Sequence, residues 1–297
     1  MITYSIKDLE RLSGIKAHTI RIWEKRYELI FPKRTATNIR YYDGEDLKQV
    51  LNIAILNRSG IKISKIAKLS SDELTEKVLE VGTTDSSEEA QIESLLISMI
   101  EFDDKRFESV LTNCTIRMGF EDTVIKVIYP FFKKVGLLWQ LDSINPAQEH
   151  YISNIIRQKI IVAIDGLSGN AKSGAKTFLL FLQEGELHEL GLLFYNYLIL
   201  KAGHKVMYLG QSVPLENVVT TASQFTVSYL VTSIHSSFLQ EDFMKRLNSI
   251  GEELPHIPVI LTNRIEFDIS SSTIDQLYVN LSPEAFNEML NTDKTTK

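Results

Sequence analysis

Apolar positions near the N-terminus repeat at a helical spacing on both sides of a tight turn. Ile6, Leu9 and Leu12 follow one another at three-residue intervals, and Ile20 and Trp23 resume that interval after a Ser-Gly pair. This spacing predicts one short helix, a turn and a second short helix. Two helices joined in this way are typical of a helix-turn-helix.

The apolar pattern changes further along the chain. From about residue 88 to 165, apolar residues keep the three- and four-residue spacing of packed helices, which predicts a helical bundle. After a Gly- and Ser-rich break at 166–174, short apolar runs alternate with helical stretches. The runs are TFLLFLQ (177–183), KVMYLG (205–210), SYLVTSI (228–234), PVILTN (258–263) and LYVNL (277–281). This alternation predicts a doubly wound parallel sheet.

The length of 297 residues suits two domains, or three if small ones are counted. The changes of pattern predict three parts, at 1–75, 85–167 and 175–295, with a linker near residues 82–87. No apolar run reaches the roughly 18 residues that a membrane-spanning helix needs, and the N-terminus lacks the apolar region of a signal peptide. The single cysteine excludes an internal disulfide framework. We therefore expect a cytoplasmic protein without a membrane anchor.

Charge is distributed unevenly between these parts. Residues 1–70 contain 14 Lys and Arg against 7 Asp and Glu, a net charge of +7, whereas the whole chain carries -6. The remaining 227 residues therefore carry -13. This asymmetry predicts a basic module that binds a polyanion and an acidic body with another role.

The basic module has a motif of known type. An RxWExR pattern over residues 21–26 is followed by a P-x-R pair at 32–34 and an R-Y-Y-D run at 40–43, in a stretch that predicts a two-stranded wing. From about residue 3 to 69 the sequence closely resembles the winged helix-turn-helix of MerR-type transcriptional regulators. The resemblance implies binding to double-stranded operator DNA as a homodimer or tetramer. The candidate DNA contacts are Lys16, His18, Thr19, Arg21, Arg26, Arg34, Asn38, Arg40 and Tyr41. Within the same motif, Ile20 and Trp23 are predicted to belong to the core.

A histidine motif follows the first predicted strand. Ligands of doubly wound sheets bind beyond the carboxyl ends of the strands, so this position suits a ligand site. Glu186-Leu-His188-Glu-Leu-Gly191 is an ExHxxG sequence, which resembles the signature of cobalamin-binding domains. By that resemblance, His188 binds cobalt as its lower ligand, Glu186 orients the imidazole, and Gly191 lets the cofactor approach the backbone.

A second group of candidates lies in the predicted bundle. Trp139 is followed ten and eleven residues later by Glu149 and His150. This resembles the four-helix cap of light-sensing, adenosylcobalamin-dependent MerR-type repressors of carotenoid genes, and of corrinoid methyltransferases. The resemblance implies that Trp139 covers the upper face of the corrin ring and that Glu149 contacts the adenosyl group. His150 would bind cobalt after photolysis. The alternative interpretation makes Trp139 a core aromatic residue and Glu149-His150 a solvated pair.

Two positions depart from the cobalamin-binding pattern. After the third strand, Ser233 matches the family, but His235 stands where a smaller apolar residue is expected. After the fourth strand, Thr262 and Asn263 replace a Gly-Gly pair that lets the nucleotide tail of the cofactor pass along bare backbone. These added side chains would narrow the tail channel.

The sequence therefore predicts a multidomain protein of the α and α/β class, with a MerR-type winged helix-turn-helix, a four-helix bundle and a flavodoxin-like doubly wound parallel sheet. Its predicted function is non-enzymatic: transcriptional regulation, by repression under the control of adenosylcobalamin and light. One alternative is a MerR-type regulator whose cobalamin-like domain senses another ligand or a protein partner. A corrinoid methyl-carrier subunit and an FMN-binding protein are more distant alternatives, because the first leaves residues 1–70 unexplained and the second lacks a phosphate loop.

Overall fold

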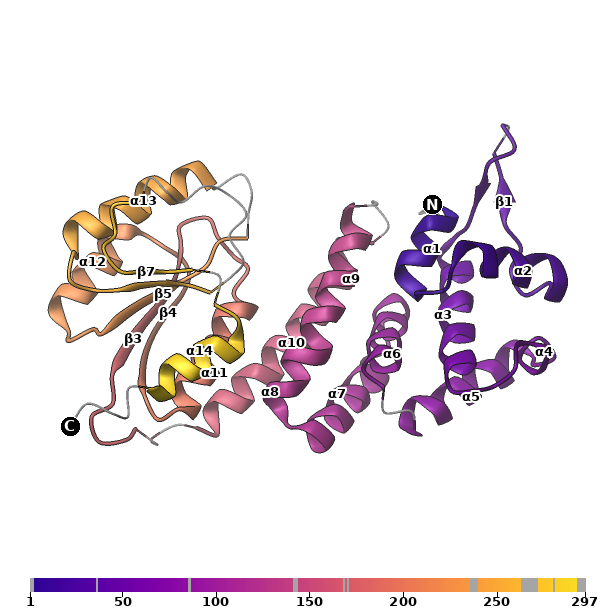
Figure 1. Cartoon of the computed structure of the whole chain (residues 1–297), viewed down its shortest axis with the longest axis horizontal. Coiled ribbons are helices and arrows are strands. Elements are labelled where there is room, and N and C mark those ends of the chain that lie inside the picture. Colours follow the sequence, from indigo (N-terminus) through magenta and orange to yellow (C-terminus); the bar gives the residue numbers. More distant parts are fainter. Residues whose placement is uncertain are drawn as a thin grey trace. The chain divides into compact units, whose positions relative to one another are not determined.

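The computed structural model describes residues 3–35, 37–84, 87–140, 144–167, 169, 171–235, 240–262, 272–279 and 281–292. Its contacts divide the chain into two compact units, Met1–Ile155 and Ile156–Lys297, which we call the N-terminal unit and the C-terminal unit. Figure 1 shows that the N-terminal unit is mainly helical and that the C-terminal unit is a sheet flanked by helices. The finer division into parts at 1–75, 85–167 and 175–295 stays a prediction.

The N-terminal unit begins with the predicted helix-turn-helix and wing. Helix α1 (Ile6–Ser13) starts at a capping box between Ser5 and Asp8, and ends at Gly14, whose φ of 70° suits a residue without a side chain. Helix α2 (Ala17–Tyr27) follows, and strands β1 (Lys33–Arg34) and β2 (Arg40–Tyr41) form the antiparallel wing. Ile20 and Trp23 are buried, as predicted for core residues.

Three more helices complete this part of the N-terminal unit. They are α3 (Gly44–Arg58), α4 (Ile63–Ile66) and α5 (Ser71–Thr84). A capping box between Asp43 and Asp46 starts α3 directly after the wing. Helix α5 continues to Thr84, so residues 82–84 of the linker expected near residues 82–87 are helical, and residues 85–86 lie outside the described residues.

Four helical segments form the bundle. The first two are α6 (Glu88–Glu101) and α7 (Asp104–Met118), and the last is α10 (Pro146–Asp165). The third is a continuous helical run that consists of α8 (Phe120–Thr123), a π-helical turn (Val124–Ile128) and α9 (Tyr129–Gln140). Every residue of α6 from Ala90 to Met99 is buried, because α6 packs against α3 and α5 on one side and α7 and α9 on another. Phe107 and Phe131 meet edge to face in the core, with ring centroids 5.8 Å apart.

The C-terminal unit contains the predicted parallel sheet. Its strands are β3 (Thr177–Gln183), β4 (Lys205–Val213), β5 (Tyr229–Thr232), β6 (Val259–Leu261) and β7 (Leu277–Tyr278), in the order β4-β3-β5-β6-β7. All neighbouring strands pair in parallel. The chain leaves β3 toward β4 and then crosses to β5 on the other side. The carboxyl ends of β3 and β5 therefore form the switch point at which such sheets bind ligands.

Helices cover both faces of this sheet, as Figure 1 shows. Helices α12 (Leu215–Gln224) and α13 (Gln240–Glu253) lie on one face, and α11 (Leu190–Lys201) and α14 (Pro283–Thr292) lie on the other. Alternate residues of β3 serve the two cores, and Leu179 and Phe181 join the core under α12 and α13. A strand buried on both faces explains the continuous apolar run that the sequence shows there. Among the described residues, no helix is long and apolar enough to cross a membrane.

We expect Phe107→Ala to destabilise the bundle by about 3–5 kcal/mol, since the substitution leaves a cavity beside Phe131. Urea unfolding followed by circular dichroism measures the loss. Ile116→Ala on the same helix is the control, because Ile116 is 78% exposed. Equal midpoints for the two variants would contradict the packing described for Phe107.

Candidate functional site

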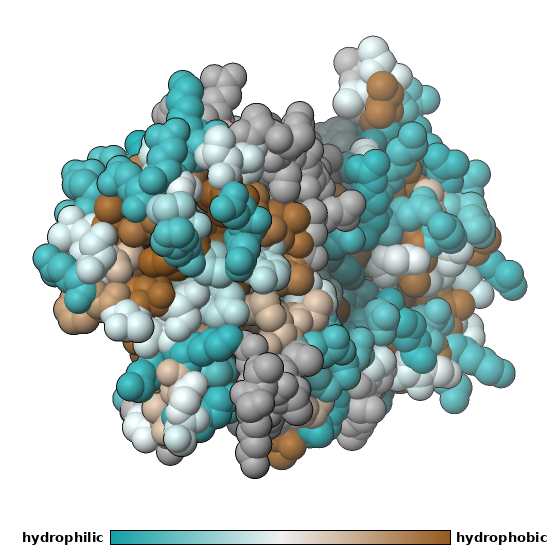
Figure 2. Space-filling view, turned by 60° about the vertical axis from the view of Figure 1, so that its left-hand side comes forward, coloured by the Kyte–Doolittle hydropathy of each residue, from teal (hydrophilic) through white to brown (hydrophobic). Residues whose placement is uncertain are grey.

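The basic face of the helix-turn-helix presents most of its predicted DNA contacts to solvent. Six candidates are exposed and three are half-buried. The exposed residues are Lys16, His18, Arg21, Arg26, Arg34 and Asn38, and the half-buried ones are Thr19, Arg40 and Tyr41. Side chains from α2 and from the wing meet in an open hollow lined by Arg21, Ile22, Lys25, Arg26 and Arg40. In Figure 2, hydrophilic residues make up most of the visible surface of the N-terminal unit. The arrangement gives a groove of positive charge suited to a phosphate backbone.

An ion pair fixes one of these arginines and a hydrogen bond fixes another. Arg40 on the wing donates from Nε to Glu24 on α2 over 3.0 Å, which ties the wing to the second helix. At the wing tip, Arg34 donates from Nη1 to the amide oxygen of Asn38 over 2.7 Å, and Asn38 adopts a left-handed φ of 65° that asparagine tolerates. The sequence motif contains Glu24, but its role as the partner of Arg40 emerges only from the fold.

The glutamate and histidine of the ExHxxG motif lie in the loop between β3 and α11, and Gly191 lies in the first turn of α11. Glu186 is fully buried, and its Oε1 lies 2.5 Å from His188 Nδ1. The same oxygen accepts hydrogen bonds from the backbone N–H groups of Leu187 and His188, and Oε2 accepts one from the N–H of His235 over 2.8 Å. A carboxylate at Nδ1 places the imidazole proton there, so Nε2 of His188 carries the lone pair that a metal requires. The predicted orienting contact between Glu186 and His188 is thus present in the structure.

Several buried polar groups lie near this loop, at the carboxyl ends of β3 and β5. Ser233 is fully buried, and its hydroxyl has no hydrogen-bond partner among the described residues. The side-chain amide of Gln183 and the hydroxyl of Thr232 are also buried and have no hydrogen-bond partner among the described residues. Leaving such groups buried and unpaired is costly, so a polar ligand at the switch point would satisfy them. The sequence pattern pointed to Ser233 but not to Gln183, whose only signal was a polar residue at the end of an apolar strand.

The backbone at Gly191 also leaves space. A side chain built there would meet only His235 Cε1 within 4.0 Å, at an ordinary contact distance. Packing within the protein therefore does not explain the glycine, whereas the close approach of a ligand would.

A buried tyrosine, Tyr195, links α11 to the end of β6. Tyr195 is buried, and its hydroxyl donates to the carbonyl oxygens of Thr262 over 3.0 Å and Leu281 over 3.2 Å. Its ring packs against Phe286, with centroids 4.8 Å apart. Thr262 is itself buried, while Asn263 lies outside the described residues. The structure thus adds Tyr195, which sequence analysis missed, to the region in which the replacement of Gly-Gly was expected to narrow a tail channel.

The cap candidates belong to the N-terminal unit. Trp139 lies near the end of α9 and is 42% exposed, so it is not a core aromatic residue. Glu149 and His150 lie in the first turn of α10, with His150 Nδ1 3.3 Å from Glu149 Oε2. Glu149 also accepts a hydrogen bond from the hydroxyl of Ser153. The structure therefore brings Glu149 and His150 together on the exposed start of a helix.

A further polar group flanks His188 in the C-terminal unit. Glu189 is buried, lies 2.5 Å from Arg157 Nε, and accepts a hydrogen bond from the Tyr208 hydroxyl over 2.9 Å. These contacts fix the residue that follows His188 in the chain, and they connect α10, α11 and β4. The pairing spans 32 positions, so local sequence patterns did not reveal it.

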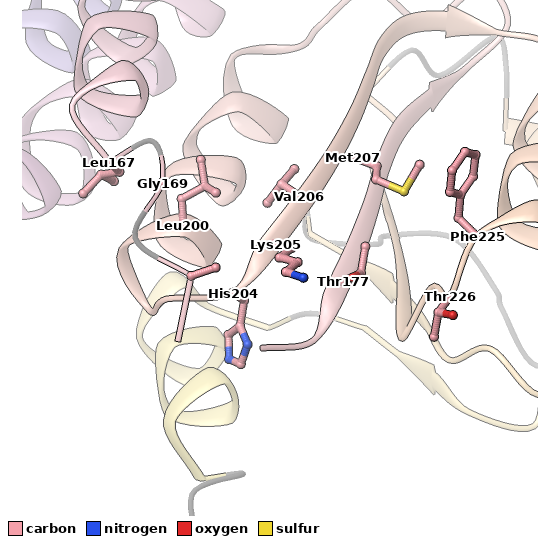
Figure 3. A pocket seen from close by; sticks show the side chains of 11 residues that line it. Leu167, Gly169, Thr177, Leu200, His204, Lys205, Val206, Met207, Phe225 and Thr226 are labelled. Atoms are coloured by element: carbon pink, nitrogen blue, oxygen red, sulfur yellow. The ribbon is translucent and has the colours of Figure 1, made fainter. Parts of the chain in front are cut away.

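Figure 3 shows a pocket at the other end of the strands, where β3 and β4 begin. Residues of this pocket include Thr177, Lys205 and Met207. His204 lines it as well, but its Nδ1 accepts a hydrogen bond from the N–H of Lys176, and its Nε2 lies 3.1 Å from the carbonyl oxygen of Leu290. His204 therefore holds the start of β3 against α14 and has a structural role.

Comparisons with known proteins agree with these features. Residues 4–73 match the MerR HTH family regulatory protein model, and residues 91–163 match the B12 binding domain model. The HTH-type transcriptional repressor CarH of Myxococcus xanthus is 28% identical over 265 residues, which are 86% of this chain and 87% of CarH. The repressor CarA of the same organism is 25% identical over 268 residues, 88% of this chain and 86% of CarA.

A solved structure supports the fold. The monomethylamine corrinoid protein of Methanosarcina barkeri is similar with a TM-score of 0.55 and 20% sequence identity, over 69% of this chain and 100% of that protein. The chain therefore combines a MerR-type helix-turn-helix with a B12-binding-type domain that follows it, as in the two repressors that it resembles over most of its length.

We expect the double variant Arg21→Ala, Arg40→Ala to bind DNA roughly tenfold more weakly or worse, because each lost cation removes a phosphate or base contact. Fluorescence anisotropy at fixed salt, with a fragment that the wild-type protein selects from random DNA, measures the effect. The double variant Lys105→Ala, Arg117→Ala removes two exposed cations from the bundle and serves as the control. Unchanged affinity of the first variant would exclude this face as the DNA interface.

Proposed function

We propose that this protein is a transcriptional repressor whose assembly and operator binding are controlled by adenosylcobalamin and light. The observation that carries the proposal is the buried Glu186 carboxylate, which fixes the His188 imidazole beside the switch point of the sheet. The same chain contains this site and a MerR-type helix-turn-helix, which favours a regulator over an enzyme. The two Myxococcus xanthus relatives that bear the name repressor support the sign of regulation.

The residues present suit a corrinoid on its lower side. His188 offers Nε2 to a metal, Gly191 leaves room beside the backbone, and Ser233 offers a buried hydroxyl without a partner among the described residues. When bound, adenosylcobalamin supplies a cobalt ion and a light-sensitive cobalt–carbon bond. Glu186 holds the imidazole in one tautomer and orientation, and burial of the carboxylate keeps water from competing for it.

On the upper side, the N-terminal unit contributes three residues to the proposal. Trp139 presents an exposed indole that would cover the corrin face, and Glu149 would contact the adenosyl group. His150, at the exposed start of α10, is proposed as the upper ligand of the illuminated protein. A change at this upper side would bias an equilibrium between assembled and dissociated regulator, as a homodimer or tetramer on its operator.

A second candidate function keeps the architecture without the cofactor. Tyr195 donates to the carbonyl oxygen of Thr262 in the region that would hold the nucleotide tail, which favours a regulator that senses another ligand or a protein. Cobinamide, a corrinoid without that tail, separates the cases. Retention of cobinamide but not of cobalamin would mean that only the tail region is closed, and retention of neither would favour the second candidate.

We expect the protein to retain adenosylcobalamin in the dark after desalting, and its absorption spectrum to shift on illumination. His188→Ala should lower the affinity by about 10- to 100-fold or more, since it removes a proposed metal ligand. His256→Ala, which removes another exposed histidine of the same unit, is the control. A His188→Ala spectrum and affinity identical to those of the wild type would refute the role of His188 as lower ligand.

A further inference from the structure

A buried ionic cluster joins the helix-turn-helix to the bundle within the N-terminal unit. Its centre is Glu93 on α6, whose side chain is fully buried within the stretch Ala90–Met99, where every residue is buried. Arg58, at the end of α3, donates to Glu93 Oε2. The other oxygen, Oε1, has no hydrogen-bond partner among the described residues. The carboxylate is thus paired on one side only.

Both cations near this carboxylate reach the turn that precedes the second helix of the helix-turn-helix. Lys134 on α9 donates from Nζ to the carbonyl oxygen of Leu12 over 2.9 Å. Arg58 lies at hydrogen-bond distance, 3.5 Å, from the carbonyl oxygen of Ser13. The last carbonyl groups of a helix have no partner inside that helix, and cations near them are stabilising. Lys134 and Arg58 therefore hold the end of α1 to the bundle.

The same helices carry the cap candidates. Lys134 lies on α9, which also contains Trp139. At the other end of α6, Gln148 of α10 donates from Nε2 to the carbonyl oxygen of Ile100 over 3.1 Å. The hydroxyl of Tyr151 on α10 donates to the carbonyl oxygen of Phe102 over 3.2 Å, and the ring centroids of Tyr151 and Phe102 are 5.3 Å apart. Displacement of α9 or α10 would therefore act directly on contacts with α6 or with the turn after α1.

The electrostatics of the cluster make it sensitive to such displacement. Burial raises the pKa of Glu93 to about 7, and the charges of Arg58 and Lys134 oppose that rise. Burial also lowers the pKa of Lys134, against the attraction of Glu93. Removal of one partner from a buried charged group is strongly destabilising, because the remaining charge loses its compensation.

We propose that the Arg58–Glu93–Lys134 cluster is the joint that transmits the state of the bundle to the DNA-binding module, by holding the turn between α1 and α2 in place. The joint itself stands on contacts inside the N-terminal unit. Its use in signalling rests on the proposed function, in which a ligand acts on the helices that contain Trp139, Glu149 and His150.

Two pairs of variants test the joint in the full-length protein at pH 8. Lys134→Gln and Glu93→Gln change members of the cluster, while Lys133→Gln and Glu88→Gln change exposed residues of the same type on the same helices. Hydrogen exchange monitored by mass spectrometry reports on the turn. We expect exchange over residues 12–17 to become about tenfold faster in the cluster variants and to stay unchanged in the controls. Unaltered exchange of α7 in each variant shows that the bundle remains folded.

Operator binding tests the transmission. For each variant, the ratio of the dissociation constants of illuminated and dark protein is measured with adenosylcobalamin and the selected DNA fragment. We expect this ratio to fall toward one in the cluster variants while their corrinoid spectra stay as in the wild type.

The two readouts separate the outcomes. Unchanged exchange over residues 12–17 in both cluster variants would overturn the joint. Faster exchange with an unchanged ratio would overturn its role in transmission. A wild-type ratio of one would refute the proposed light control, while the exchange result would still decide whether the joint exists. If Glu93→Gln does not fold, Lys134→Gln alone decides, because it removes the contact with Leu12 and leaves the Arg58–Glu93 pair in place.

Discussion

The burial of Glu186 is the constraint on which the candidate ligand site depends. A carboxylate in a protein interior requires donors, and Glu186 receives them from Leu187, His188 and His235. The backbone donor of His235 lies beyond β5 and the others lie beyond β3, so one side chain fixes the loops after two adjacent strands. The position of the His188 imidazole follows from this arrangement and not from the flexibility of an exposed loop. A site held in this way is preorganised before any ligand arrives.

Much of the fold follows from local patterns in the sequence. Three-residue spacing predicted α1 and α2, and apolar runs predicted every described strand of the parallel sheet. The signal is strongest for β3, β5 and β6, which are almost entirely buried. The resemblance of the ExHxxG motif to the signature of cobalamin-binding domains predicted the contact between Glu186 and His188. Trp139 shows the limit of such patterns: its residue type is compatible with a core, and only the fold reveals that it is exposed.

The contacts that no local pattern predicted connect residues distant in the chain. Arg58 and Glu93 are 35 positions apart, and Lys134 lies 122 positions from Leu12. Tyr195 meets Thr262 across 67 positions. From its neighbours in the sequence, each of these side chains is indistinguishable from an ordinary surface charge or an ordinary core aromatic residue. Their partners are set by the packing of whole helices and strands, which periodicity does not encode.

Two of the buried glutamates, Glu93 and Glu186, show opposite ways of placing a charge inside this protein. Glu186 uses both oxygens for hydrogen bonds, so its surroundings stabilise one arrangement. Glu93 uses one oxygen, and the other lacks a partner among the described residues. A fully satisfied network favours rigidity, whereas a partly satisfied one lies closer in free energy to alternative arrangements. Rigidity suits the position that would hold a metal ligand. A smaller energetic preference would suit the proposed joint between two modules, because a modest displacement of α9 would then change which groups Arg58 and Lys134 bind.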